Sequence, residues 1–278
     1  MNSLSYRTSS LFHFTENGEV IRSILETGII PNFCKENLCY EDRNMVIGVP
    51  MVSFCDIPLT RTSEFTKRYG DFAIGLSKEW AIRNHINPVL YVNDARVLMS
   101  LGFMRAYLQT QEQEVRNRGG NENKITINLS SAESLKGLTY FINMNNAKDA
   151  VYSLYGYVKK YVSPGPDSHD EENYIENEWR YVVTGDGIDW KWSEKAYKAW
   201  RGKGKKPEPT EALKSQRLRF SVVDVTHIIL EKENQIGDMV DFIINMDHIG
   251  GNEVELSYDE KKILLTKIIS REKIGKDF

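Results

Sequence analysis

Two glutamates stand close together where an acidic stretch of the chain changes into an aromatic and β-branched one. Glu176 and Glu178 lie in residues 174–183, which read YIENEWRYVV. In a β-strand, side chains two residues apart point to one face, so the sequence predicts both carboxylates on one face and Trp179 on the other, toward the core. Two like charges held this close raise the pKa of at least one of them, which suits proton or cation chemistry. The alternative is an edge strand with two solvated glutamates and Arg180 as their partner.

His13 is the histidine best placed for a rigid polar role. It lies in LFHFT, residues 11–15, whose alternating pattern predicts a first core strand. A lone strand histidine can equally be structural. Tyr69 precedes another predicted strand, where it would form either the wall of a pocket or the edge of the core. The glycine-rich loops that usually cradle phosphates, GxGxxG and GxxxxGK[ST], do not occur in the sequence.

The composition indicates a sizeable globular protein. With 278 residues, 41% of them hydrophobic, the chain can bury a large core, and we expect one domain over residues 1–278. A net charge of −3 gives no overall basic field, so nucleic acid could bind only at a local patch. The N-terminus is polar and no apolar run is long enough to span a membrane, which predicts a cytoplasmic protein. Three cysteines, Cys34, Cys39 and Cys55, read as free thiols without zinc-site spacing, and no metal is expected.

Hydrophobic periodicity predicts an α+β fold with a mixed or antiparallel β-sheet core. A helix should begin after Asn17 and end at Gly28, and another should begin after Ser77. Residues 94–160 favour long helices and are predicted to form a helical insertion within the domain. Near the C-terminus, alternation at 254–256 and 263–265 suggests extended segments around a turn. The predicted strands lie at 11–15, 49–59, 71–76, 88–92, 174–183 and 218–230.

Residues 186–209 combine three tryptophans with a basic cluster. Interleaved aromatic and basic side chains can stack on bases and neutralise phosphates, which would suit a nucleic acid or a protein partner. The other interpretation is a solvated basic loop whose tryptophans pack on the edge of the domain. The sequence alone leaves both open.

Seven segments of the sequence form a recognisable series. They are LFHFT at 11–15, ILETGIIP at 24–31, PMVSFCDIPL at 50–59, YGDFAIGLSKEWA at 69–81, PVLYV at 88–92, ENEWRYV at 176–182 and LRFSVVDVTHIIL at 218–230. In their order and spacing they resemble the AbiGi abortive-infection family. The combination of FCDIP, YGDFAIGLSKEW and EWRYV is specific, and the resemblance covers about residues 10–232. Members of this family are associated with bacterial defence against phage and have been labelled antitoxins.

The same arrangement is similar, more distantly, to the ADP-ribosyltransferase fold, although the Ser-Thr-Ser strand usual there is absent and Ser53 is a partial substitute. That resemblance implies NAD as substrate, a first-strand histidine on the nicotinamide ribose, an aromatic stacked on nicotinamide, and a glutamate that polarises the ribose. Carried over to this sequence, the implied NAD-binding residues are His13, Thr15, Ser53 and Tyr69, and the implied catalytic residues are Glu178 and Glu176.

The resemblances lead to two expectations of different classes. The first is an anti-phage effector that transfers ADP-ribose from NAD to a macromolecular acceptor, either nucleic acid or protein; hydrolysis of NAD without an acceptor is a variant of it. The second is a non-catalytic antitoxin or phage sensor that binds a toxin or another partner, for instance through residues 186–209. Neither expectation involves a membrane.

Overall fold

A single mixed sheet of eight strands forms the centre of the protein. The computed structural model describes residues 8–38, 45–64, 69–118, 132–164, 170–204 and 206–277. In space the strands run in the order β12-β11-β4-β1-β3-β10-β5, with β2 also paired to β3. Among the described strands of this sheet, β11 and β12 pair in parallel and the other pairs are antiparallel, which agrees with the predicted mixed or antiparallel sheet. The strands are β1 (Ser10–Thr15), β2 (Asn32–Asn37), β3 (Val46–Cys55), β4 (Phe72–Ser77), β5 (Asn87–Pro88), β10 (Glu178–Val182), β11 (Val225–Leu230) and β12 (Ile268–Ser270).

The sheet opens between β1 and β3. On one side β1 pairs with β4 along its whole length, from Ser10↔Ser77 to Thr15↔Phe72. On the other side it meets β3 at a single position, Phe12↔Cys55. Pairing along β3 resumes with β2 at Met51. The two strands therefore diverge, and the edge of β3 between these positions faces a gap instead of a neighbouring strand.

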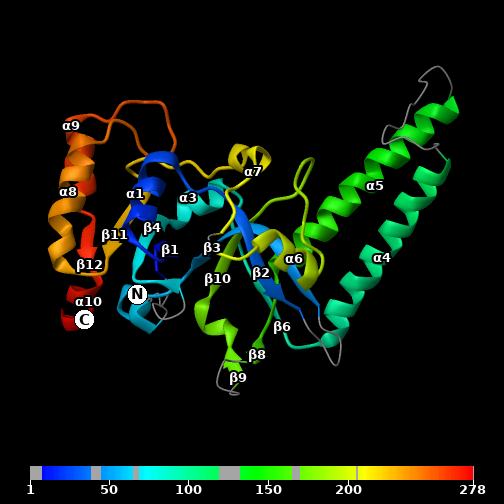
Figure 1. The fold of residues 1–278 in the computed structure, drawn as a ribbon, viewed down its shortest axis with the longest axis horizontal. Helices are drawn as coiled ribbons and strands as arrows, with labels where there is room; N and C mark the ends of the chain where they lie inside the picture. Colours follow the sequence, from blue (N-terminus) through cyan, green and yellow to red (C-terminus); the bar gives the residue numbers. More distant parts are fainter. Residues whose placement is uncertain are drawn as a thin grey trace, which may run out of the picture.

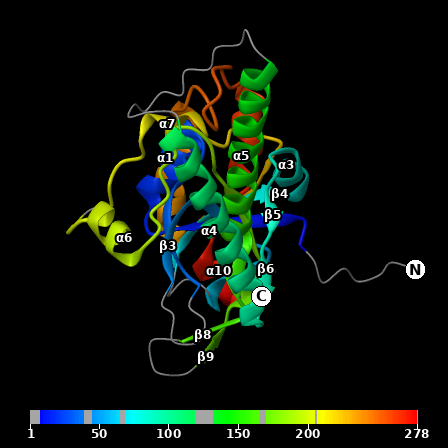
Figure 2. The same ribbon diagram turned by 90° about the vertical axis from the view of Figure 1, so that its right-hand side faces the viewer.

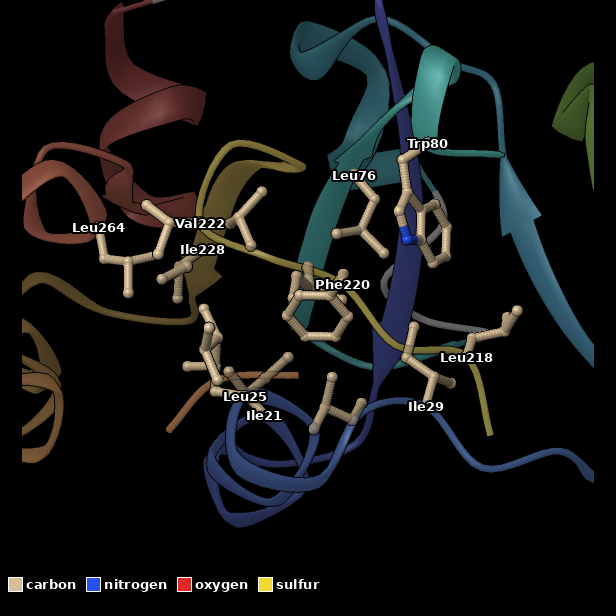
Figure 3. Packing of buried hydrophobic residues seen from close by; sticks show 14 of the residues in the cluster. Ile21, Leu25, Ile29, Leu76, Trp80, Leu218, Phe220, Val222, Ile228 and Leu264 are labelled. Atoms are coloured by element: carbon tan, nitrogen blue, oxygen red, sulfur yellow. The ribbon is translucent and has the colours of Figure 1, made fainter. Parts of the chain in front are cut away.

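One face of the sheet is covered by helices that bury the main hydrophobic core (Figures 1 and 3). The first helix, α1 (Gly18–Thr27), begins as predicted: the Asn17 side chain accepts from the backbone of Val20, and Gly28 follows the helix. Trp80 is almost completely buried and its indole N–H donates to the carbonyl of Arg219, 2.8 Å away. The other helices on this face are α3 (Lys78–Arg83), α8 (Ile236–Asn245) and α9 (Tyr258–Leu265).

The C-terminal region differs from its predicted extended structure. Residues 258–265 form α9, because Ser257 and Glu260 make a reciprocal capping box that begins a helix. Alternation of apolar residues over so short a segment did not distinguish the two structures. The chain then adds β12 beside β11 and ends in α10 (Arg271–Asp277).

Two long antiparallel helices occupy the region predicted as a helical insertion. They are α4 (Ala95–Arg118) and α5 (Ala132–Tyr157), and they extend from the body at the end opposite α8 and α9 (Figure 1). Their base packs on β2 and β3 through a second core cluster that includes Leu98, Leu101 and Tyr155. Within the described residues, no helix is both long and apolar enough to cross a membrane. Short strands flank this region: β6 (Leu90–Val92) pairs with β7 (Val158–Lys160), and β8 (Val162–Pro164) with β9 (Asp170–Glu172).

The tryptophans of residues 186–209 are packed against the body. Trp190 and Trp192 stack on each other with ring centroids 5.2 Å apart, and Arg105 of α4 lies over Trp192. Trp200, in α6 (Glu194–Arg201), makes an edge contact with Phe33. The three tryptophans therefore pack on the edge of the domain, as the second interpretation of residues 186–209 predicts. Figure 2 shows that α6 lies beside the sheet. The chain then continues from α6 to α7 (Glu211–Ser215).

Gly70 sets the approach of Tyr69 to β1. Its φ is +101°, and a Cβ there would lie 2.1 Å from the carbonyl oxygen of Thr15. We expect Gly70→Ala to lower the free energy of unfolding by at least about 2 kcal/mol, because both the backbone conformation and the close contact exclude a side chain. Chemical denaturation measures this.

Gly237 in α8 is the matched control, because a Cβ there meets no atom within 4 Å. Gly237→Ala should be neutral or stabilising by up to about 1 kcal/mol, since alanine favours helix over glycine. Equal effects of the two substitutions would contradict the role given to Gly70.

Candidate functional site

A cavity of about 460 Å³ lies at the opening between β1 and β3, a size typical of small-molecule sites. Its walls come from β1, β2 and β3 and from the segments around Lys159, Glu176 and Glu178. Residues far apart in the sequence therefore meet there. The lining residues with polar or titratable side chains are His13, Asn32, Cys34, Lys35, Glu36, Asn37, Ser53, Cys55, Tyr69, Lys159, Ser163, Glu176, Glu178 and Lys206.

The two glutamates meet in the cavity, but they do not lie on one strand as predicted. Glu176 ends the 3₁₀ helix η2 (Asn173–Glu176), and Glu178 is the first residue of β10. Asn177 between them has a left-handed backbone, with φ of 42°, which asparagine tolerates better than most residues. Both glutamates are buried, at 1% and 5% exposure, so the alternative of a solvated edge strand is wrong.

A lysine and an arginine compensate the buried carboxylates. Lys159 of β7 lies 2.8 Å from Glu176 Oε2 and 2.9 Å from Glu178 Oε2. Arg180 is fully buried and binds Glu178 through two nitrogens, at 2.7 and 3.0 Å. It also binds Glu36 of β2 at 2.8 Å. Three carboxylates and two cations thus share one buried network, which is held by charge-assisted hydrogen bonds.

This network fixes the charge of Glu178. Burial alone would raise its pKa, but the charges of Arg180 and Lys159 and their hydrogen bonds outweigh burial and lower the pKa to about 2. The pKa of Lys159 is raised by the carboxylates in spite of its burial. The pKa of Glu36 is raised, chiefly because it is buried. Glu178 is therefore anionic at neutral pH, a fixed negative charge and a weak base.

His13 faces the cavity as a neutral ring. Its Nδ1 lies 2.8 Å from the carbonyl oxygen of Ser53 on β3. Because a carbonyl can only accept, Nδ1 carries the proton and Nε2 of the neutral ring is an acceptor. Burial is the main cause that lowers the pKa of His13; the contact with Ser53 opposes it and the charge of Lys206 adds to it. This contact also bridges the opening between β1 and β3.

Tyr69 connects the aromatic side of the cavity to the acidic side. Its hydroxyl donates to Glu176 Oε1 at 2.6 Å. Burial, followed by the charge of Glu176, raises the pKa of Tyr69 well above its ordinary value, so the phenol stays protonated. Its ring lies near that of Phe14, with centroids 6.4 Å apart. Tyr69 can therefore offer a ring face to a ligand while it orients Glu176.

Thr15 is not part of the cavity wall, although the sequence placed it in the site. Its hydroxyl donates to the carbonyl of Asn17 at 3.3 Å, and its backbone pairs with Phe72. The other five proposed residues, His13, Ser53, Tyr69, Glu176 and Glu178, line the cavity together.

The sequence offers Arg180 as a partner of the two glutamates, but it does not indicate Lys159 or the third carboxylate, Glu36. Glu36 and Arg180 are 144 positions apart, and Lys159 follows α5 by two residues, so no local pattern connects them. Cys34 and Cys55 also line the cavity, and burial raises the pKa of both thiols, which makes them weak nucleophiles. Cys39 lies outside the described residues. Among the described residues, no group of three or more histidine, cysteine, aspartate or glutamate side chains could hold a metal ion.

The lowered pKa of Glu178 predicts a pH-dependent effect of its substitution. Because the pKa is depressed on folding, from 4.5 to about 2, its charge stabilises the fold above about pH 4.5, and this stabilisation is lost as the pH falls toward 2. Glu178→Gln should cost about 3 kcal/mol at pH 7, where it leaves Arg180 and Lys159 poorly compensated. The deficit should narrow as the pH falls from about 4.5 to 2. Denaturant unfolding at several pH values measures it, with exposed Glu253→Gln as control. A deficit independent of pH would contradict the assignment.

The comparisons with known proteins agree on one family. The family model described as "Putative abortive phage resistance protein AbiGi, antitoxin" matches residues 27–231. The abortive phage resistance protein AbiGi of Lactococcus lactis subsp. cremoris is 28% identical over an alignment of 254 residues, and the match covers 83% of this chain and 89% of that protein. No solved structure matches significantly, so the distant resemblance to ADP-ribosyltransferases gains no support from this comparison. Since the family model spans well over half of the chain, the chain belongs to the AbiGi family of abortive phage resistance proteins.

Proposed function

We propose that the protein contributes to abortive phage resistance as an enzyme that binds NAD in the cavity and transfers its ADP-ribose to a macromolecule. One observation carries the proposal. Five of the six residues that the resemblance assigns to NAD binding and catalysis, taken from separate parts of the chain, line the same cavity. The cavity also lies where the sheet opens, so a ligand can reach the edge of β3 without breaking a strand pairing.

The charge of Glu178 suits the chemistry of this transfer. When the bond between nicotinamide and ribose breaks, its electron pair leaves with nicotinamide and positive charge develops on the ribose. A carboxylate that is already fixed and anionic stabilises this charge without reorganising, and so favours the transition state over the ground state. Arg180 and Lys159 hold Glu178 in this state. Its low pKa makes it an electrostatic group and not a general base.

Other residues would orient the substrate and the acceptor. Nε2 of His13 is an acceptor for a ribose hydroxyl, and the ring of Tyr69 offers a face to nicotinamide. Glu176, held by Tyr69 and Lys159, is the second carboxylate in reach of the cavity. It would orient the acceptor nucleophile and take its proton as the new bond to the ribose forms.

Incubation of the purified protein with labelled NAD and a bacterial or phage lysate tests this function. We expect nicotinamide release and label on nucleic acid or protein, with Glu178→Gln at least about 100-fold slower, as for the loss of a group that stabilises transition-state charge. His13→Ala should also be slower, and exposed Glu253→Gln unchanged.

Each other outcome has a distinct meaning. Nicotinamide release without label would identify NAD hydrolysis. If the wild type consumes no NAD with any lysate, the enzyme proposal is wrong. Assays of Glu178→Gln are run below its melting temperature, so that loss of activity is not loss of fold.

A second candidate is a non-catalytic antitoxin, and the comparisons favour it over the first. The family description names an antitoxin, and neither matched description names an enzymatic activity. The structure adds that each buried glutamate already has cationic or hydroxyl partners, as a purely structural network would. On this interpretation the network holds the fold in shape, and the protein acts by binding a partner protein.

Co-expression with the product of a neighbouring gene distinguishes the two candidates. An antitoxin should be harmless alone, should co-purify with a partner that is toxic alone, and should still neutralise it as Glu178→Gln. The enzyme predicts that Glu178→Gln loses phage protection while it stays folded. Co-purification together with protection that depends on Glu178 would contradict a purely non-catalytic role.

A further inference from the structure

The lysines that line the cavity differ in what they bind. Lys159 pairs with Glu176 and Glu178, and Lys35 lies 3.4 Å from Glu194. Lys206 also lines the cavity, but it has no ion-pair partner within the described part of the chain. Its ammonium is thus the cation available to a ligand at this wall.

The chain directly after Lys206 is attached to the cavity wall. The carbonyl of Pro207 accepts from Nδ2 of Asn32, a residue that also lines the cavity, at 3.2 Å. The backbone next to Lys206 is therefore held against the cavity on its C-terminal side, although the side chain of Lys206 is exposed.

The charge of Lys206 reaches into the cavity. It lowers the pKa of buried His13, after the larger effect of burial, and it acts on the Cys34 thiol in the same direction, against the effect of burial. Both groups are neutral at pH 7, so neither compensates the positive charge of the Lys206 ammonium. An anionic group of a ligand beside His13 would compensate it.

We infer that Lys206, with the Asn32 amide beside it, forms an anion subsite that binds the phosphates of the ligand. The acidic network at Glu176 and Glu178 then receives a hydroxyl-bearing or cationic group of the same ligand. A dinucleotide such as NAD, with a diphosphate next to a nicotinamide ribose, has this distribution of charge. The inference rests on the proposed use of the cavity for NAD, and it adds the residue that selects phosphorylated ligands over unphosphorylated ones.

Calorimetric titration of the full chain with NAD, ADP-ribose, nicotinamide riboside and inorganic pyrophosphate tests the subsite. Lys206→Gln should weaken NAD and ADP-ribose about tenfold, as expected for one charge-assisted contact, and should leave nicotinamide riboside unchanged. Lys206→Arg should retain most of the affinity. Lys203→Gln is the matched control, because Lys203 is exposed on the same segment but does not line the cavity. Binding of NAD to the wild type should also weaken with salt more steeply than binding to Lys206→Gln.

The possible failures are separable. If NAD binds equally to the wild type and to Lys206→Gln, or if Lys203→Gln and Lys206→Gln weaken it equally, the subsite is wrong while the proposed function stands. If NAD does not bind but pyrophosphate binds in a Lys206-dependent manner, the subsite stands and the NAD proposal fails. If the wild type binds none of the phosphorylated probes, both are overturned.

Discussion

The buried guanidinium of Arg180 joins three parts of the molecule that the chain brings together from far apart. From β10 it reaches Glu178 beside it, Glu36 on β2 and the carbonyl of Gly156 near the end of α5. Its side chain has no exposure to water and makes hydrogen bonds to all three of these groups. Transfer of such charges out of water costs more free energy than the attraction within a single ion pair recovers, so the network adds little net stability to the fold. Its consequence is geometric, because it fixes the orientation of Glu178 relative to the opening in the sheet.

The opening between β1 and β3 leaves the main hydrophobic core intact. The main core lies between the sheet and the helices α1, α3, α8 and α9, and it closes around Trp80 and Phe220. The single pairing of β1 with β3 is reinforced by full pairing of β1 with β4 on its other side. The protein can therefore leave the edge of β3 unpaired next to a cavity, and the contact of His13 with Ser53 satisfies one of the backbone groups exposed there.

Local signals in the sequence predicted much of this fold. The alternation of residues 11–15, the cap at Asn17 with Gly28 after the helix, and the cap at Ser77 each correspond to an element of the structure, because their causes lie within a few residues. The site was predictable only in part. His13, Tyr69 and Glu178 can be named from local patterns together with a resemblance, whereas the ion pairs of Glu178 with Lys159 and of Arg180 with Glu36 join separate segments of the chain, which no periodicity records. A local feature was also missed. The left-handed backbone of Asn177 separates Glu176 from the strand that begins at Glu178, so the two glutamates do not share a strand, yet both carboxylates bind Lys159.

The position of α5 ties the two candidate functions to the same contacts. Arg180 binds the Gly156 carbonyl within α5, and Lys159 follows that helix by two residues, so the end of the long hairpin is fastened to the acidic network at two points. A partner that shifts α5 would have to displace Lys159 from Glu176 and Glu178, and a ligand that competes with Lys159 for these carboxylates would loosen the same attachment. Coupling of this kind is reciprocal, because a change at one site alters the free energy of the other by the same amount. The end of α5 and the acidic wall of the cavity are therefore held by one set of contacts, and both candidate functions depend on it.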